Sequence, residues 1–402
     1  MQLNSFETSE TDPAELVAAS ARCYLALGRL DGALAYASPD VLKLFALKLV
    51  RRTLARSLAA AGYLFTEATF EAWLSRSGGP PQGGPGTAAP ASAIAAAVLA
   101  EMRHSKWPAL AEAAGLVWRA APQIGIGADH VGDQIDGQGE PPSESGQGLA
   151  NREDLRAVID VARQLLVGGR ETPAETQPLS LLIDRLSRAP AALVPMARGT
   201  AVIETDAGAL VVPTVTQHSH CWALGLVLGE MLAGQGVLRL PLPFAGSIAP
   251  EVLRQDCEAD VRRLRLAVDI DDAASGLFAD LDTACRLVCR ADAALSDTRS
   301  TSRAPMVFAM IAGLGVVTRS QLTRAFEMTG AGVDGVLAKL SVAGLIEKRS
   351  GRAGGYFVAR DNRADRHLGT ASVVPLRLAD VDRFDAAVAD LDRLLERSNS
   401  MR

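Results

Sequence analysis

Aromatic residues are scarce in this chain of 402 residues, of which phenylalanine, tryptophan and tyrosine together supply only 4 %. Large β-sheets are normally rich in aromatic and β-branched side chains, whereas alanine and leucine favour helices. The composition therefore excludes a large all-β architecture. Hydrophobic residues still make up 48 % of the chain, which is enough for sizeable cores at this length. We expect a mainly α-helical protein with several domains.

Cysteine and long apolar runs are also sparse. The five cysteines are an odd number scattered over the chain, unlike a disulfide framework. Apolar stretches such as Trp222 to Val227 are soon interrupted by Gly or Glu, so none reaches the roughly 20 residues that a membrane-spanning helix needs. The N-terminal sequence MQLNSFETSETDPAEL has neither the basic start nor the apolar core of a secretory signal. The sequence predicts a cytoplasmic protein with reduced thiols and no membrane partner.

The chain has no overall positive charge, since its net charge is −5. This balance argues against a polybasic coat for nucleic acid or membrane. Between Thr301 and Arg360, however, the sequence contains eight Arg and Lys residues but only three Asp and Glu residues, so the local net charge is +5. A basic module on an acidic body is typical of a nucleic-acid-binding domain, although a solvated basic face has the same composition.

Helical periodicity and Gly/Pro-rich interruptions divide the chain into five segments. The predicted division is an N-terminal helical region, flexible Gly/Pro-rich segments around one helix, a central helical domain, a winged helix-turn-helix and a C-terminal helix, with bounds 12–76, 77–150, 151–297, 303–361 and 375–397. Within the first region, Asp12, Ser38 and Thr66 are expected to cap three helices. The central domain is expected to contain a small β-hairpin over 201–216.

Several helices of the body carry charged stripes. The helix predicted from Pro39 carries a basic cluster, Lys48, Arg51, Arg52 and Arg56. The sequence predicts separate helices over 250–266 and 271–295, whose acidic residues fall largely opposite the apolar stripe. A solvated face is the expected role of these acids, which are Asp269, Asp271, Asp272, Asp280 and Asp282.

The segment from Pro305 to Asp361 predicts a winged helix-turn-helix. Three short helices are expected over 305–311, 319–326 and 331–343, with a Gly-ended turn between the second and third. Gly344 ends the third helix, and two strand-like stretches, 345–348 and 356–358, flank a basic loop. A hairpin directly after the third helix is the wing of such a domain.

The predicted chemistry of this module is binding to double-stranded DNA. The major groove admits an α-helix, so the third helix would approach base edges while surrounding cations neutralise phosphates. The predicted DNA-binding residues are Arg319, Arg324, Thr329, Lys339, Lys348, Arg349 and Arg352. Asp334 and Gly335 weaken this interpretation, because they place a negative charge and a flexible position in the third helix.

Three stretches of the chain resemble a known family: LGRLDGAL over 27–34, STSRAPMVFAMIAGLGVVT over 300–318 and LIEKRSGRAGGYFVA over 345–359. The resemblance is to uncharacterised proteins of rhizobia and related proteobacteria, in which a helical domain of unknown function precedes a helix-turn-helix DNA-binding domain. It implies a DNA-binding transcriptional regulator. A similar C-terminal module follows the catalytic domain of some Fic adenylyltransferases, but their HPFxxGNGR motif is absent here, so that activity is not implied.

The alternative interpretation is an enzyme, a toxin-like protein or an assembly protein with its site in the helical body and the C-terminal module as a protein-protein adaptor. The strongest candidate for such a site is His218, His220 and Cys221, whose imidazole and thiolate groups suit zinc. No CxxC pair, HExxH, GxSxG or Walker motif accompanies them, so buried packing is the favoured role. We therefore expect a non-enzymatic protein without metal or cofactor. The amphipathic segment 375–397 has two alternative roles, packing on the winged helix-turn-helix or pairing with the same segment of a second chain, and we hypothesise a homodimer.

Overall fold

The structure is a computed structural model that describes residues 12–64, 66–75, 82–83, 89–121, 145–168, 177–194, 199–205, 208–214, 220–254, 257–296, 302–351 and 354–360. It is mainly helical, as the composition predicts. The chain clusters into two units, 1–359 and 360–402. The predicted C-terminal helix, 375–397, lies outside the described residues.

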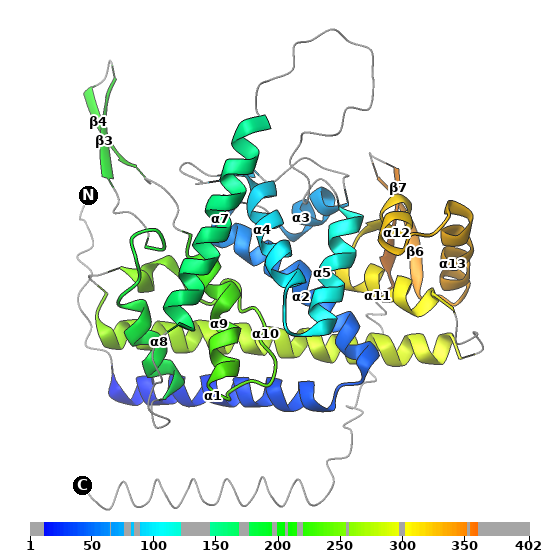
Figure 1. Ribbon diagram of the computed structural model, residues 1–402, viewed down its shortest axis with the longest axis horizontal. Coiled ribbons are helices and arrows are strands. Elements are labelled where there is room, and N and C mark those ends of the chain that lie inside the picture. Colours follow the sequence, from blue (N-terminus) through cyan, green and yellow to red (C-terminus); the bar gives the residue numbers. More distant parts are fainter. Residues whose placement is uncertain are drawn as a thin grey trace, which may run out of the picture. The chain divides into compact units, whose positions relative to one another are not determined.

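Helices of the first unit form the body of the protein (Figure 1). They are α1 (Pro13–Tyr36), α2 (Pro39–Ala60), α3 (Glu67–Leu74), α4 (Ala91–Arg103), α5 (Pro108–Ala120), α7 (Ser145–Leu166), α8 (Pro178–Leu186), α9 (Trp222–Gly234), the 3₁₀ helix η2 (Pro250–Leu253) and α10 (Ala259–Ala294). Two antiparallel strand pairs accompany them, β1 (Tyr63–Leu64) with β2 (Gln82–Gly83) and β3 (Gly199–Thr205) with β4 (Gly208–Thr214).

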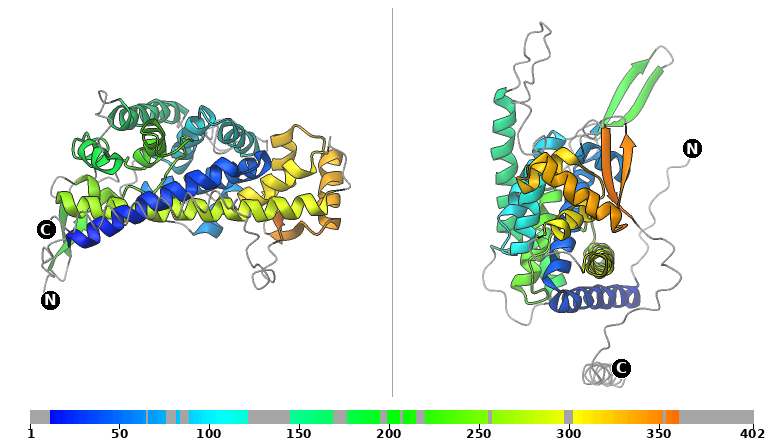
Figure 2. Two further views of the ribbon diagram at one scale, coloured as in Figure 1. Left: turned by 90° about the horizontal axis from the view of Figure 1, so that it is seen from below. Right: turned by 90° about the vertical axis from the view of Figure 1, so that its right-hand side faces the viewer.

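The centre of this body is α2, which contacts α4, α5, α9, α10 and the later helix α11 (Ala304–Leu314). Its apolar side chains are buried on several sides, including Leu44, Phe45, Leu49, Leu54 and Leu58. A helix that is apolar over most of its circumference is stable only when neighbours cover it, which explains the central position of α2. Around it, α1 and α10 lie side by side over much of their length (Figure 2).

Local capping sets the starts of several helices. Asp12 accepts a hydrogen bond from the backbone N–H of Ala14 at 2.9 Å, and Thr66 forms a capping box with Thr69. Ser38 accepts from the N–H of Val41 at 3.4 Å. These predicted caps are therefore confirmed, because a side-chain oxygen satisfies backbone donors that have no partner within the helix.

Three predicted boundaries are wrong. The helix expected over 250–266 is divided into η2 and the start of α10. From Ala259 onward it is continuous with the helix expected over 271–295, because no Gly or Pro lies between them and Leu266, Ala267 and Ile270 continue the buried stripe. The helix that opens the central domain, predicted over 151–297, begins earlier, at Ser145. The one helix expected within 77–150 is divided into α4 and α5, and Pro108 starts the second of these helices.

The last part of the first unit contains α11 (Ala304–Leu314), β5 (Val317–Thr318), α12 (Arg319–Phe326), α13 (Gly330–Val342), β6 (Ile346–Gly351) and β7 (Gly354–Ala359). Both β5 and β6 pair antiparallel with β7, which gives the sheet order β5-β7-β6. Glu327 has a φ of 51° and forms the tight turn between α12 and α13. Gly344, with a φ of 69°, follows α13 as expected from the sequence.

Packing fixes two of these three helices on the body. Helix α11 contacts α2 and α10, whereas α12 contacts α5 and lies between α5 and α13 (Figure 1). The side chain of Gln321 is buried and donates to the carbonyl of Leu74 at the end of α3, at 2.7 Å. The segment 302–359 thus shares its core with the helical body.

Candidate nucleic-acid interface

One face of α13 is exposed. Val333, Leu337 and Leu340 are buried at helical spacing and attach the helix to its neighbours. The opposite face is open to solvent and carries Ala331, Asp334, Gly335, Ala338, Lys339, Ser341 and Val342. The exposed face is therefore rich in small side chains, so a binding partner can approach the backbone of α13 closely.

Thr329 precedes α13 and is exposed. Its hydroxyl accepts a hydrogen bond from the backbone N–H of Gly332 at 3.2 Å, so it serves as the N-cap of the helix. As an N-cap, the Thr329 hydroxyl uses only its oxygen, so its hydrogen can still be donated outward. The capping role is therefore compatible with the predicted DNA contact.

The negative charge of Asp334 is paired with Arg319 from the first turn of α12. The Nε and Nη2 atoms of Arg319 donate to the two carboxylate oxygens at 2.6 and 2.7 Å. These hydrogen bonds, with the charges of Arg319 and Lys348, lower the pKa of Asp334, and the same bonds raise the pKa of Arg319. Both groups therefore remain charged at neutral pH, and the positive charge of Arg319 is largely compensated within the protein.

Lys348 and Arg349 of β6 are both exposed but differ in their surroundings. Consecutive residues of a strand point to opposite faces. The charge of Lys348 contributes to the lowered pKa of Asp334. Arg349 forms an ion pair with Glu347, two residues earlier on the same face of the strand. Arg352 lies outside the described residues.

Arg324 is directed toward the helical body. Its Nη2 donates to the carbonyl of Ala120, at the end of α5, at 2.9 Å. In return, Arg119 of α5 donates to the carbonyl of Ala325 at 3.1 Å, and Arg303 donates to Phe326 at 2.7 Å. Positive side chains at helix C-termini complement the helix dipole. Arg324 contributes to the packing of α12 on α5, and we therefore leave it out of the interface.

Sequence reasoning missed these arginine contacts. Arg324 and its acceptor Ala120 are 204 residues apart in the chain, and an arginine on a short amphipathic helix has the same pattern whether it meets phosphate or a carbonyl. The signal that was present is the position of Arg324 in the last turn of its helix, where cations commonly complete the hydrogen bonding of helix ends.

The alternative site around His218, His220 and Cys221 lies partly outside the described residues, because His218 does. His220 accepts a hydrogen bond from the indole N–H of Trp222 at 3.4 Å, and burial lowers its pKa. The Cys221 thiol is buried and is 3.8 Å from the carbonyl oxygen of Ala60. Within the described parts of the chain, no cluster of three or more His, Cys, Asp or Glu side chains is arranged to hold a metal ion.

A cavity of about 710 Å³ opens among α4, α5, α7 and α9. Arg163 lies in its lining and bonds to Glu101, Glu230 and Asp160, while Trp118 supplies aromatic surface. The pKa of Arg163 is raised, mainly by the hydrogen bond to Glu230. Because these central charges are already paired with one another, they do not define the charge of a ligand.

Across the described helices, none has the length and apolar character needed to cross a membrane. The sequence matches no known protein-family model and no curated protein.

Proposed function

We propose that residues 302–360 are a winged helix-turn-helix and that the protein is a non-enzymatic transcriptional regulator, which binds double-stranded DNA through α13 and the β6–β7 hairpin. The observation that carries this proposal is the element order of α11 to β7 with the sheet order β5-β7-β6, in which α13 is exposed and an antiparallel hairpin directly follows it. The resemblance to proteins with a C-terminal helix-turn-helix supports the same function.

In this proposal α13 enters the major groove with its small side chains toward the bases. Thr329 and Lys339 are the polar side chains of α13 and its cap that reach DNA, and Lys348 with Arg349 contacts phosphates from the hairpin. Arg319 has a different role from the one expected, because it compensates Asp334 and thereby reduces the repulsion between α13 and the phosphates. Arg352 remains a predicted phosphate contact on the hairpin loop.

Salt-dependent binding tests the proposal. Fluorescence anisotropy with a mixed-sequence labelled duplex would give the dissociation constant at several salt concentrations. Lys339→Ala and Lys348→Ala should each weaken binding and reduce the slope of log K against log salt by roughly 0.9, the contribution of one phosphate contact. Arg188→Ala is the matched control, since it removes an exposed arginine that follows α8, outside the proposed surface. Equal slopes for all four proteins would refute the proposal.

A second candidate function is protein docking through the same face of α13. The pairs Arg319–Asp334 and Arg349–Glu347 compensate two of the predicted phosphate-binding cations, and Val342 on α13 is 90 % exposed. An apolar and nearly neutral face suits a protein better than a polyanion. Under this candidate, DNA affinity is weak and insensitive to Lys339→Ala and Lys348→Ala.

We also propose that the regulator is a homodimer, as two-fold symmetric DNA sites require. The mass of one chain is 42.2 kDa. Light scattering should therefore give about twice this mass, and a monomer mass at micromolar concentration would rule out a stable dimer.

A further inference from the structure

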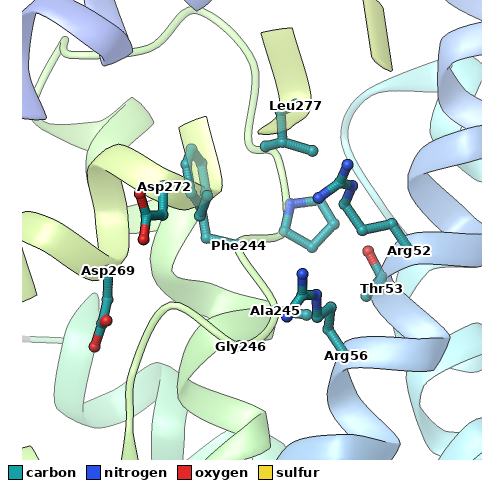
Figure 3. Close-up of a pocket in the computed structure, with 11 residues that line it drawn as sticks. Arg52, Thr53, Arg56, Phe244, Ala245, Gly246, Asp269, Asp272 and Leu277 are labelled. Atoms are coloured by element: carbon teal, nitrogen blue, oxygen red, sulfur yellow. The ribbon is translucent and has the colours of Figure 1, made fainter. Parts of the chain in front are cut away.

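A second cavity, of about 210 Å³, lies between α2 and α10 and is bordered by the segment from Pro243 to Gly246. Figure 3 shows Arg52, Thr53 and Arg56 on one side of it and Asp269 and Asp272 on the other. A single water occupies about 30 Å³ of liquid, and drug-sized ligands need at least about 300 Å³. The cavity is therefore the size of a small metabolite.

The wall formed by 243–246 is held closely against α9. The N–H of Phe244 donates to the carbonyl of Gly225 at 2.8 Å. A Cβ atom on Gly225 would lie 2.8 Å from the carbonyl oxygen of Phe244, so the glycine permits this approach. The hydroxyl of Ser247 donates to the same Phe244 oxygen at 2.7 Å and is fully buried. These contacts give the cavity a defined wall before any ligand binds.

The α2 side offers a positive charge and a hydroxyl. Arg52 is paired with Asp280 at 2.7 Å and also donates to the carbonyl of Gly276. Arg56, by contrast, forms no ion pair or hydrogen bond with the residues that the structure describes. Thr53 is 1 % exposed, and its hydroxyl has no hydrogen-bond partner among those residues. A buried hydroxyl without a partner is costly, so it marks a place where a ligand or water would be stabilised.

The α10 side offers negative charge. Asp269 and Asp272 are three residues apart and therefore share a face of the helix. One oxygen of Asp269 is 3.4 Å from Arg265, whereas its other oxygen is buried and has no partner in the described structure. Burial, together with the charges of Asp272 and Glu251, raises the pKa of Asp269 despite the opposing effect of Arg265. Asp272 has no ion pair with any described residue.

We infer that this cavity binds a small zwitterion of the size and charge of a free amino acid. Its carboxylate would meet Arg56 and the hydroxyl of Thr53, and its ammonium group would meet Asp269 and Asp272. Phe244 and Leu277 line the remaining surface and accommodate an apolar side chain. A simple anion would face the two aspartates without compensation, and a simple cation would face the arginine, so a ligand with both charges fits best. This inference is independent of DNA binding.

Isothermal titration of the full-length protein with each of the twenty standard amino acids tests the inference. At least one should bind saturably, and its decarboxylated amine and its deaminated acid should each bind at least about tenfold more weakly, the effect of losing roughly 1.4 kcal/mol. The absence of saturable binding by all twenty amino acids at millimolar concentration would overturn the inference.

Three variants assign the binding to this cavity. Arg56→Gln and Asp272→Asn should each weaken binding of the best amino acid at least tenfold, while the control Arg188→Gln, just after α8, should not. Thr53→Val removes the partnerless hydroxyl at nearly constant shape, so it should weaken binding and leave the melting temperature unchanged or higher. Unchanged affinity in Arg56→Gln and Asp272→Asn, with normal melting curves, would place the ligand elsewhere and refute this site.

Discussion

Arg319 and Asp334 face each other across the turn between α12 and α13, joined by two hydrogen bonds of 2.6 and 2.7 Å. The pair is exposed, with about half of each side chain accessible to solvent. Its main effect is therefore on the charge of the exposed face of α13, since ion pairs in solvent contribute little to stability. The negative charge of Asp334, which is unfavourable beside phosphates, is therefore compensated by Arg319.

Asp334→Asn should strengthen DNA binding. The change leaves the positive charge of Arg319 uncompensated, so the slope of log K against log salt should become steeper by roughly 0.9 if Arg319 then reaches a phosphate. Arg319→Ala should act in the opposite direction, because it leaves the negative charge of Asp334 alone beside the groove. Anisotropy titrations at three or more salt concentrations would measure both effects. Weaker binding by Asp334→Asn would contradict a groove-binding role for α13.

Gly229→Ala should destabilise the protein much more than Gly234→Ala, although both glycines belong to α9. A Cβ atom on Gly229 would lie 1.7 Å from the carbonyl oxygen of Leu242, whereas one on Gly234 would have nothing within 4 Å. We expect a loss of about 3 kcal/mol or more for the first, and for the second a change of less than about 1 kcal/mol, in the stabilising direction. Urea unfolding followed by circular dichroism would measure both free energies.

The same pair of variants tests the cavity wall. Because Leu242 precedes the segment 243–246, Gly229→Ala should also weaken amino-acid binding, whereas Gly234→Ala should not. Similar unfolding free energies for the two variants would show that the segment after α9 is not packed as closely as these contacts indicate.

The sequence predicts best what depends on neighbouring residues. The caps at Asp12, Ser38 and Thr66 involve partners within three residues, and each forms as expected. The hairpin over β3 and β4 and the strands after α13 likewise follow from local alternation and turn residues. The apolar stripes predict which side of each helix is buried, because helical period alone determines that side.

Contacts between distant segments are not visible in such patterns. Asp280 belongs to a row of acids expected to be solvated, but it pairs with Arg52, which is 228 residues away, and with Lys48. Three members of the basic cluster on α2 pair with acids in this way, Lys48 and Arg52 with Asp280 and Arg51 with Glu71. A single sequence gives the charge of each helix but not its neighbour, so the cavity beside Arg56 could not be predicted.

The five cysteines should differ sharply in reactivity. Cys289 is exposed, whereas Cys23 and Cys221 are buried and Cys257 and Cys285 are intermediate. Burial, and to a smaller extent the nearby charge of Asp271, raises the pKa of Cys23 from 9.0 to about 12. Because the thiolate is the reactive form, Cys23 should resist a thiol reagent at pH 8 until the protein unfolds, while Cys289 reacts first. Timed labelling followed by peptide mass mapping would give the order.

The raised pKa also fixes how stability depends on pH. The native state holds the Cys23 proton more tightly than the unfolded state, so the favourable contribution is complete below pH 9.0 and is lost as the pH rises toward 12. The loss should approach about 1.4 kcal/mol per pH unit within this window. Cys23→Ala should remove this part of the alkaline slope in urea titrations, whereas Cys289→Ala should retain it. Labelling of Cys23 in the native protein as fast as Cys289 would contradict its position in the core between α1 and α10.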